Sequence, residues 1–112
     1  MRKLEIIVRP FKVDDVKEAL TALDIKGMSV VDIKGFGRQR GHKEVYRGAE
    51  YQVDFVAKSK IEVVVEASQV KTVLDAVVQS ARTGQVGDGK IFILPVEDVV
   101  RIRTGETGQD AI

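Results

Sequence analysis

The two halves of the chain repeat one sequence pattern, and this repeat restricts the fold more than any other feature. Residues 3–8 read Lys-Leu-Glu-Ile-Ile-Val, and residues 60–65 read Lys-Ile-Glu-Val-Val-Val. After each of these β-branched segments, apolar residues recur at the spacing of one helix face. Gly27 and Gly84 follow the two helical patterns at equivalent places. Each half therefore predicts a strand followed by an amphipathic helix.

The two predicted helices each have one apolar face. In the first half this face consists of Val13, Val16, Leu20 and Leu23. In the second half it consists of Val70, Val73, Leu74, Val77, Val78 and Ala81. Ser68 stands just before the second pattern and is a candidate N-cap, because a serine hydroxyl accepts hydrogen bonds from unpaired backbone N–H groups. A further strand is expected after each helix, over residues 30–36 and 90–94.

The resulting order of elements, βαβ followed by βαβ, predicts one α+β domain over residues 1–112. Two such units commonly interleave into the ferredoxin-like fold, a four-stranded antiparallel sheet with both helices on one face. A long loop then joins the second and third strands. The other face of the sheet carries apolar residues such as Ile7 and Val64 and has no helix to cover it. Since an uncovered apolar face marks an interface, we expect a homo-oligomer with the sheets turned inward.

The composition excludes several kinds of chemistry. The chain has no cysteine and a single histidine, His42, so disulfides, thiolate catalysis and histidine-based metal sites are not expected. The formal net charge of +1 provides no overall field for nucleic acid or membranes. Apolar runs such as residues 63–65 are far shorter than the ~20 residues of a membrane span. We therefore expect a cytoplasmic protein that is not an enzyme and does not insert into membranes.

Residues 37–55 do not fit the repeat. The segment contains three glycines and both tyrosines of the chain, Tyr46 and Tyr51, with little periodicity. The basic residues in and just before its first half are Lys34, Arg38, Arg40, Lys43 and Arg47. Structureless connections beyond ~15 residues are uncommon in compact domains and are often functional. Two interpretations remain open: a long solvated β-hairpin, or an extended flexible loop that binds other proteins or receives a modification.

A second segment outside the repeat, residues 82–90, has the composition of a phosphate-binding loop. Gly84 to Lys90 match the spacing G-x-x-x-x-G-K, but Ile91 stands where a Walker A motif needs Ser or Thr. A helix precedes the segment and a strand follows it, which is also the wrong context for that motif. The residue types nevertheless suit an anion, because glycines let backbone N–H groups converge and a lysine adds charge. The alternative is an ordinary glycine-rich turn before a strand.

The C-terminal stretch, residues 96–112, includes an alternating segment at 99–105 that predicts an extended strand. Alternation would place Arg101 and Arg103 on the same side of that strand. Two guanidinium groups placed in this way suit phosphate oxygens, and the alternative is that they are solvated or pair with Glu97 or Asp98. Together with the glycine-rich loop, the arginine pair predicts a site for a polyphosphate nucleotide.

Longer motifs carry a family resemblance. They are Tyr46-Arg47-Gly48-Ala49-Glu50-Tyr51, Arg82-Thr83-Gly84 with Gly87-Asp88-Gly89-Lys90-Ile91-Phe92, and Arg101-Ile102-Arg103-Thr104-Gly105-Glu106. With Arg9-Pro10-Phe11-Lys12 and Gly35-Phe36-Gly37-Arg38-Gln39, they span essentially the whole chain. The sequence thereby resembles the PII family of nitrogen-regulatory signal proteins. The resemblance implies a homotrimer of ferredoxin-like subunits that binds ATP or ADP between subunits. It also implies that 2-oxoglutarate binds with Mg²⁺ and ATP and changes the long loop, and with it the protein partners.

The resemblance also implies roles for individual residues. The nucleotide contacts would be Ser29, Gly37, Arg38, Gln39, Glu62, Val64, Gly87, Asp88, Gly89, Lys90, Arg101 and Arg103, the two last from the neighbouring subunit. Gln39 would also complete the Mg²⁺ shell, and Lys58 would pair with the distal carboxylate of 2-oxoglutarate. Tyr51 matches the tyrosine that many bacterial members have uridylylated. The implied partners include uridylyltransferase, adenylyltransferase, a histidine kinase and an ammonium channel.

Two other classes of function remain as alternatives for this fold. A nucleic-acid-binding module needs aromatic side chains that stack on bases, and residues 3–8 and 60–65 contain none. A weak nucleotide phosphohydrolase needs a general base, and no obvious one accompanies the phosphate loop. Any ATPase activity is therefore expected to be weak and incidental to signalling.

Overall fold

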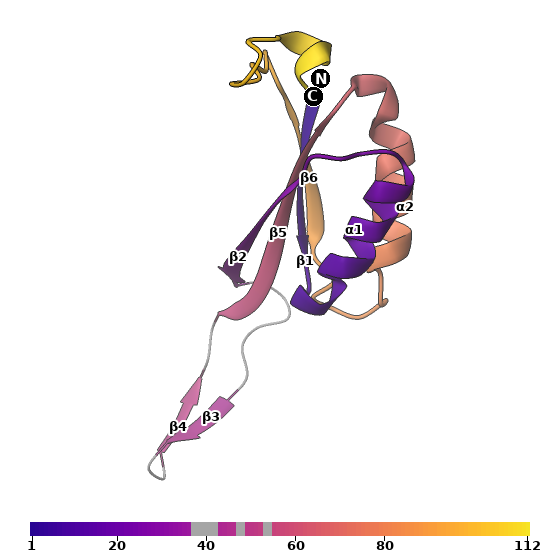
Figure 1. Ribbon diagram of the computed structural model, residues 1–112. Helices are drawn as coiled ribbons and strands as arrows, with labels where there is room; N and C mark the ends of the chain where they lie inside the picture. Colours follow the sequence, from indigo (N-terminus) through magenta and orange to yellow (C-terminus); the bar gives the residue numbers. More distant parts are fainter. Residues whose placement is uncertain (37–42, 47–48, 53–54) are drawn as a thin grey trace.

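The main sheet of the computed structural model has four antiparallel strands in the order β2-β5-β1-β6 (Figure 1). The structure describes residues 1–36, 43–46, 49–52 and 55–112. The strands of the main sheet are β1 (Arg2–Val8), β2 (Ser29–Gly35), β5 (Val56–Val65) and β6 (Lys90–Pro95). Helices α1 (Val13–Ala22) and α2 (Val70–Ala81) both lie on one face of this sheet. The ferredoxin-like arrangement predicted from the repeat is confirmed.

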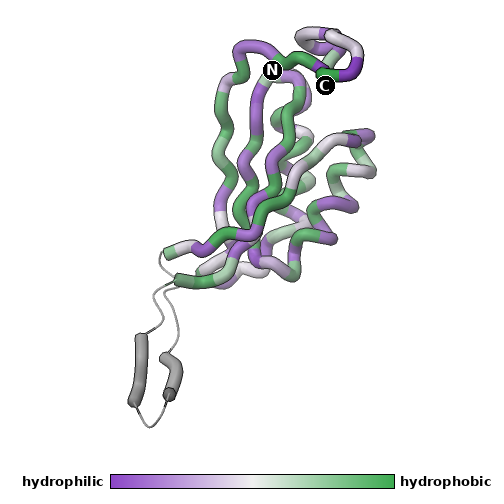
Figure 2. Tube along the Cα trace, turned by 60° about the vertical axis from the view of Figure 1, so that its left-hand side comes forward, coloured by the Kyte–Doolittle hydropathy of each residue, from purple (hydrophilic) through white to green (hydrophobic). Residues whose placement is uncertain are grey.

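The hydrophobic core lies between the sheet and the two helices. Alternate residues of the central strands are buried, namely Leu4, Ile6 and Val8 of β1 and Ile61, Val63 and Val65 of β5. The helices cover them with Val16 and Leu20 of α1 and Val73 and Val77 of α2. Figure 2 shows the same alternation as changes of hydropathy along the strands. No helix in the described part of the chain is long and apolar enough to cross a membrane.

Helix α2 begins differently from the prediction. Ser68 lies inside a 3₁₀ turn, Ala67–Gln69, that leads into the helix, and no side chain caps the N-terminus of α2. The backbone N–H of Gln69 donates to the carbonyl oxygen of Glu66 at 3.0 Å, and the N–H of Glu66 donates to Oε1 of Gln69 at 3.2 Å. The prediction of Ser68 as the N-cap was wrong, because the 3₁₀ turn that contains it supplies hydrogen-bond partners for backbone groups before α2 begins.

The sheet face opposite the helices has a charged centre and apolar margins. Residues paired directly across two strands share a face, and the register pairs Lys3 with Val64 and Glu5 with Glu62. Lys3 Nζ lies 2.8 Å from Glu62 Oε2, and this hydrogen bond is the main cause that lowers the pKa of the Glu62 carboxyl. Phe92 of β6 stands opposite Glu5 on the same face and is 46% exposed. The face is thus partly apolar, as the sequence predicts, with paired charges at its centre.

The segment at residues 37–55 contains a short two-stranded ribbon. Strand β3 (Lys43–Tyr46) pairs antiparallel with β4 (Ala49–Gln52), which places Tyr46 opposite Ala49. Of the two interpretations left open by the sequence, the backbone of these described residues matches the β-hairpin. A hairpin is also able to bind other proteins, so the role of the segment in docking stays a prediction.

The C-terminal stretch turns back on itself instead of continuing as a strand. Val100 forms one isolated antiparallel bridge with Thr107. Between them, the N–H of Arg101 donates to the carbonyl oxygen of Glu106, and the N–H of Gly105 donates to that of Arg101, both at 2.8 Å. Gly105 has a φ angle of 74°, a conformation that favours glycine. These two hydrogen bonds close a tight turn.

The predicted extended strand over residues 99–105 is therefore wrong, because the turn removes the alternation that would align Arg101 with Arg103. A 3₁₀ helix, Gly108–Ala111, follows the turn. Both termini lie at the same end of the molecule (Figure 1), where the N–H of Val96 donates to the carbonyl oxygen of Met1 at 3.2 Å.

Candidate functional site

A cleft of about 590 Å³ lies beside the glycine-rich segment that joins α2 to β6. Each strand of the main sheet contributes one residue or more to its lining, including Ile7 of β1, Gly35 of β2, Lys58 of β5 and Lys90 of β6. Phe36 and residues 85–89 also line the cleft. The fold thus brings the predicted phosphate loop, residues 82–90, to one end of the sheet.

The backbone of this loop depends on its glycines. Gly84, Gly87 and Gly89 have φ angles of 87°, 104° and 101°, in a region that residues with side chains disfavour. Gly89 also lies directly against β1, since a Cβ atom built there would stand 1.8 Å from the carbonyl oxygen of Ile7. No side chain fits at this position unless the backbone moves.

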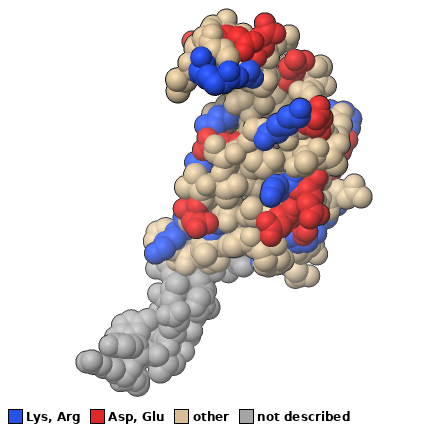
Figure 3. Space-filling model, in the orientation of Figure 1, with Lys and Arg blue, Asp and Glu red and all other residues tan. Residues whose placement is uncertain are grey.

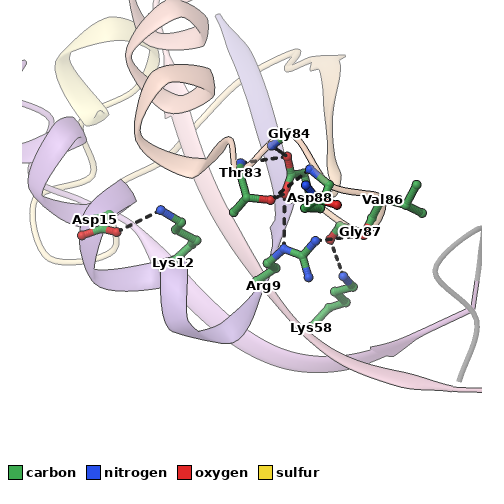
Figure 4. Close-up of polar contacts among 10 residues, drawn as sticks. Arg9, Lys12, Asp15, Lys58, Thr83, Gly84, Val86, Gly87 and Asp88 are labelled. Atoms are coloured by element: carbon green, nitrogen blue, oxygen red, sulfur yellow. Dashed lines mark hydrogen bonds and ion pairs between the residues drawn. The ribbon is translucent and has the colours of Figure 1, made fainter. Parts of the chain in front are cut away.

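The carboxylate of Asp88 ties the loop together (Figure 4). It accepts hydrogen bonds from the N–H groups of Thr83 and Gly84, at 2.9 and 2.8 Å, and from the Thr83 hydroxyl. Arg9, which follows β1, donates to the same carboxylate at 3.2 Å and to the carbonyl oxygen of Val86 at 2.9 Å. These donors, the Thr83 hydroxyl first among them, hold the pKa of the Asp88 carboxyl well below its usual range.

Lysine side chains give the cleft its positive charge. Lys58 is 9% exposed and donates a hydrogen bond to the carbonyl oxygen of Gly87. Burial, and then the charge of Arg9, lower the pKa of the Lys58 ammonium from its ordinary value of 10.5. Lys34 and Lys90 also line the cleft. Ammonium groups beside a glycine-rich backbone suit a ligand with phosphate or carboxylate groups.

The positive charge is local to the cleft. In the view of Figure 3, Lys and Arg lie interspersed with Asp and Glu over the described surface. The formal net charge of the chain is +1. Anion binding would therefore depend on short-range contacts inside the cleft, since the molecule as a whole attracts anions weakly.

A second cleft, of about 850 Å³, lies at the opposite end of the main sheet. Lys3, near the start of β1, lines this second cleft, whereas Ile7, near the end of β1, lines the first. Predicted nucleotide contacts in its lining are Ser29, Glu62, Val64 and Arg101. Residues of the C-terminal 3₁₀ helix also contribute to the wall.

The structure therefore separates the predicted site residues into two groups. The first cleft brings together Gly87, Asp88, Gly89, Lys90 and Lys58, and the second brings together Ser29, Glu62, Val64 and Arg101. Arg101 forms an ion pair at 3.2 Å with Glu106, whereas the sequence indicated Glu97 or Asp98 as its carboxylate partner. Arg103 is exposed and lines neither cleft. Gly37, Arg38, Gln39 and the side chain of Tyr51 lie outside the described residues.

Sequence reasoning missed the residues that anchor the phosphate loop, Arg9 and Thr83. Both residues stand in motifs that carry the family resemblance, yet neither was assigned a role from the sequence. The partners of Arg9 are distant in sequence, and the hydrogen bonds of Thr83 with Asp88 form within the loop itself. The available signal was an arginine directly after a buried strand, where a charge needs a partner.

The chain is similar over nearly its whole length to one known family. A family model described as "Nitrogen regulatory protein P-II" matches residues 1–106. The nitrogen regulatory proteins P-II of Azospirillum brasilense and Cereibacter sphaeroides are 62% and 58% identical over 112 residues, which is 100% of this chain and of each relative. The crystal structure of Arabidopsis thaliana PII bound to citrate matches with a TM-score of 0.82 and 44% identity, over 99% of this chain and 91% of that chain.

Proposed function

The chain belongs to the P-II family of nitrogen regulatory proteins, and from this premise we propose that it senses ATP, ADP and 2-oxoglutarate as a signal protein. It binds ATP or ADP between copies of the chain in a homotrimer. With Mg²⁺ and ATP bound it also takes 2-oxoglutarate, and the segment at residues 37–55 then changes which partner proteins it regulates. It acts by binding, and any ATP hydrolysis is incidental.

The observation that carries this proposal is that predicted contacts line two clefts at opposite ends of one sheet. The cleft at one end is lined by the glycine loop, Lys58 and Lys90, and the cleft at the other end by Ser29 and Arg101 among others. Two copies with these ends adjacent would bring the guanidinium group of Arg101 to phosphates held by the loop. A closed ring of copies repeats such a head-to-tail contact at every junction.

The residues of the first cleft suit the phosphate groups of a nucleotide. Glycine backbone and the ammonium group of Lys90 line it together, which is the usual composition of a phosphate site. Arg101 would exchange its carboxylate partner, Glu106, for a phosphate of the neighbouring site. The nucleotide contacts that we propose are Ser29, Gly37, Arg38, Gln39, Glu62, Val64, Gly87, Asp88, Gly89, Lys90, Arg101 and Arg103. Mg²⁺ would arrive on the ATP phosphates, with Gln39 in its coordination shell.

The same cleft suits a dicarboxylate effector. The Lys58 ammonium lies among residues that line it, and a buried ammonium forms a strong hydrogen bond with a carboxylate. We assign Lys58 to the distal carboxylate of 2-oxoglutarate, whose keto-acid end would chelate the Mg²⁺. The relative from Arabidopsis thaliana bound to citrate supports a carboxylate ligand in this family.

The strand residues that flank the segment at residues 37–55 lie beside this cleft, because Gly35 and Val56 pair directly and both line it. A ligand there acts on both ends of the segment at once. We therefore propose that the segment transmits ligand binding to partner proteins, such as a uridylyltransferase, an adenylyltransferase, a histidine kinase or an ammonium channel. Tyr51 in β4 (Ala49–Gln52) is the proposed site of uridylylation.

The first prediction concerns assembly. The protein should run as a trimer in light scattering at micromolar concentration, because the partly apolar sheet face needs a cover. Val64→Glu should weaken the trimer, since it puts a new charge on the sheet face that the assembly covers. Lys17→Glu on the exposed face of α1 is the matched control and should leave the mass unchanged. A stable native monomer of the unchanged chain would contradict the proposal.

The second prediction concerns the arginines of the neighbouring copy and tests the proposed function directly. Arg101→Ala or Arg103→Ala removes charge-assisted hydrogen bonds worth about 1.5–3 kcal/mol each, so ATP affinity should fall by about tenfold to a hundredfold. Isothermal titration with ATP and ADP measures the change. Lys17→Ala removes one positive charge at a distant exposed site and should bind ATP as the unchanged chain does. Unaltered affinity in both arginine variants would exclude them from the phosphate site.

A further inference from the structure

The phosphate loop has a backbone that should be mobile unless something holds it. Three of its residues, Gly84, Gly87 and Gly89, are glycines with positive φ angles, and glycine loses more conformational freedom on ordering than any other residue. A ligand that had to order this loop would bind more weakly, because the ordering opposes binding. The loop therefore needs contacts that fix it before a ligand arrives.

The carboxylate of Asp88 supplies such contacts from within the loop. One oxygen, Oδ2, accepts the N–H groups of Thr83 and Gly84 at 2.9 and 2.8 Å. The other, Oδ1, accepts the Thr83 hydroxyl and the guanidinium of Arg9, the latter at 3.2 Å. Each oxygen thus has two donors, and the side chain is fully engaged inside the protein.

Arg9 connects this network to the rest of the fold. Its Nε donates to Asp88, and its Nη2 donates to the carbonyl oxygen of Val86 at 2.9 Å, as Figure 4 shows. The side chain of Arg9 is 15% exposed and follows directly after β1 (Arg2–Val8) in sequence. A planar guanidinium donates from two nitrogens at fixed spacing, and a lysine ammonium does not reproduce this geometry.

We infer that Arg9 and Asp88 are positioning residues for the phosphate groups of a nucleotide. Their side chains hold the loop, so the nucleotide contact proposed for Asp88 is made by its backbone and not by its carboxylate. This inference rests on the proposed nucleotide site. A carboxylate that faced the phosphates would repel them. Asp88 instead has its charge matched by Arg9, which leaves the ammonium group of Lys90 to face the phosphates.

The tests are Arg9→Lys, which keeps the charge but loses the two-nitrogen fork, and Asp88→Asn, which keeps the shape but loses the charge. Thr83→Ser keeps the hydroxyl that Asp88 accepts, and Thr83→Val removes it. Lys17→Ala on α1 is the control for changes at an exposed site. Three quantities are measured on each: amide hydrogen exchange without ligand, affinity for ATP and for adenosine, and the thermal midpoint of unfolding.

In the ligand-free protein, exchange of the Thr83 and Gly84 amides should speed up by about tenfold or more in Arg9→Lys and Asp88→Asn, because the loop opens locally. ATP affinity should fall by about tenfold, while adenosine, which has no phosphate, binds as before in an NMR titration. The thermal midpoint should stay near that of the unchanged chain. Thr83→Ser should retain both amide protection and ATP affinity, and Thr83→Val should lose both.

Two results would overturn the inference while leaving the proposed function intact: ATP affinity that is unchanged in Arg9→Lys and Asp88→Asn, or an equal loss of ATP and adenosine affinity. The second result would show that these residues support the fold in general. No ATP binding by the unchanged chain would overturn both the proposed function and the ligand assigned here. Amide exchange in the ligand-free protein still decides in that case whether Arg9 and Asp88 hold the loop.

Discussion

Gly89→Ala should destabilise the protein by about 2–4 kcal/mol and remove measurable nucleotide binding, although the change adds a single methyl group. The φ angle of 101° at Gly89 is unfavourable for alanine, at about 1–2 kcal/mol for a positive φ. The new Cβ would also stand 1.8 Å from the carbonyl oxygen and 2.8 Å from the carbonyl carbon of Ile7. Both atoms are backbone, so no rotamer change relieves the contact.

The contact lies at a sensitive place in the fold. Ile7 pairs with Lys90 in the register of β1 and β6, so a displaced loop also displaces the first residue of β6 (Lys90–Pro95). The same movement shifts Lys90 away from the first cleft. Stability and ligand binding should therefore be lost together.

Two other glycines separate strain from steric overlap. Gly105 has a positive φ angle of 74°, and no atom lies within 4 Å of the place that a Cβ would take, so Gly105→Ala should show the strain alone, about 1–2 kcal/mol. Gly27 likewise has nothing within 4 Å and no positive φ, so Gly27→Ala should be neutral or slightly stabilising, by about 0.4–1 kcal/mol. Urea denaturation measures the free energy of unfolding of all three glycine-to-alanine variants. A Gly89→Ala effect no larger than that of Gly105→Ala would show that the approach to Ile7 is unimportant.

The fold was predictable because its information is local and repeated. Apolar residues have a period of two in residues 3–8 and 60–65, and each of these segments is followed by apolar residues at helical spacing. This pattern determines which side chains lie in the core, among them Leu4, Ile6, Ile61 and Val63. The repeat itself then restricts the topology, since two βαβ units interleave in few ways. The prediction failed at Ser68, where a 3₁₀ turn competes with a cap.

The candidate site was predictable in composition but not in arrangement. The glycines and Lys90 are visible in the sequence as a phosphate loop, whereas the anchoring by Arg9 joins residues 79 positions apart. The turn at Arg101–Gly105 was missed because alternation over a few residues also occurs in turns, and hydrogen bonds to Glu106 decide between the two. The predicted contacts occupy two clefts because the antiparallel register puts Ser29 and Glu62 at one end of the sheet and Lys58 at the other. No local pattern contains this register.

Lys58→Met should abolish binding of 2-oxoglutarate. Methionine keeps most of the apolar stem of lysine in its buried site and removes the ammonium group. ATP affinity should fall by no more than a few-fold, through loss of the hydrogen bond from Lys58 to the carbonyl oxygen of Gly87 in the phosphate loop. Lys17→Met on the exposed face of α1 is the control and should respond to both ligands as the unchanged chain does. Calorimetric titration of each ligand measures the two affinities separately.

The pH dependence follows from the lowered pKa of Lys58. Burial lowers this pKa below 10.5, and in the proposed site the distal carboxylate of 2-oxoglutarate needs the protonated form of Lys58. Binding of 2-oxoglutarate should therefore be complete below the lowered pKa and be lost as the pH rises through it, at a lower pH than for an ordinary lysine. In Lys58→Met this alkaline loss should be absent because no binding remains to be lost.

The binding order is the most demanding part of the same prediction. If the keto-acid end of 2-oxoglutarate chelates a Mg²⁺ that arrives on ATP, the effector should bind strongly only with Mg-ATP present. ADP lacks the γ-phosphate and should not support it. By linkage, 2-oxoglutarate must tighten ATP binding by the same factor by which ATP tightens the binding of 2-oxoglutarate. Titration into ligand-free, ADP-bound and Mg-ATP-bound protein measures these factors. Equal affinity in all three states would contradict a shared metal, and Lys58 would then bind the effector without any coupling to the nucleotide.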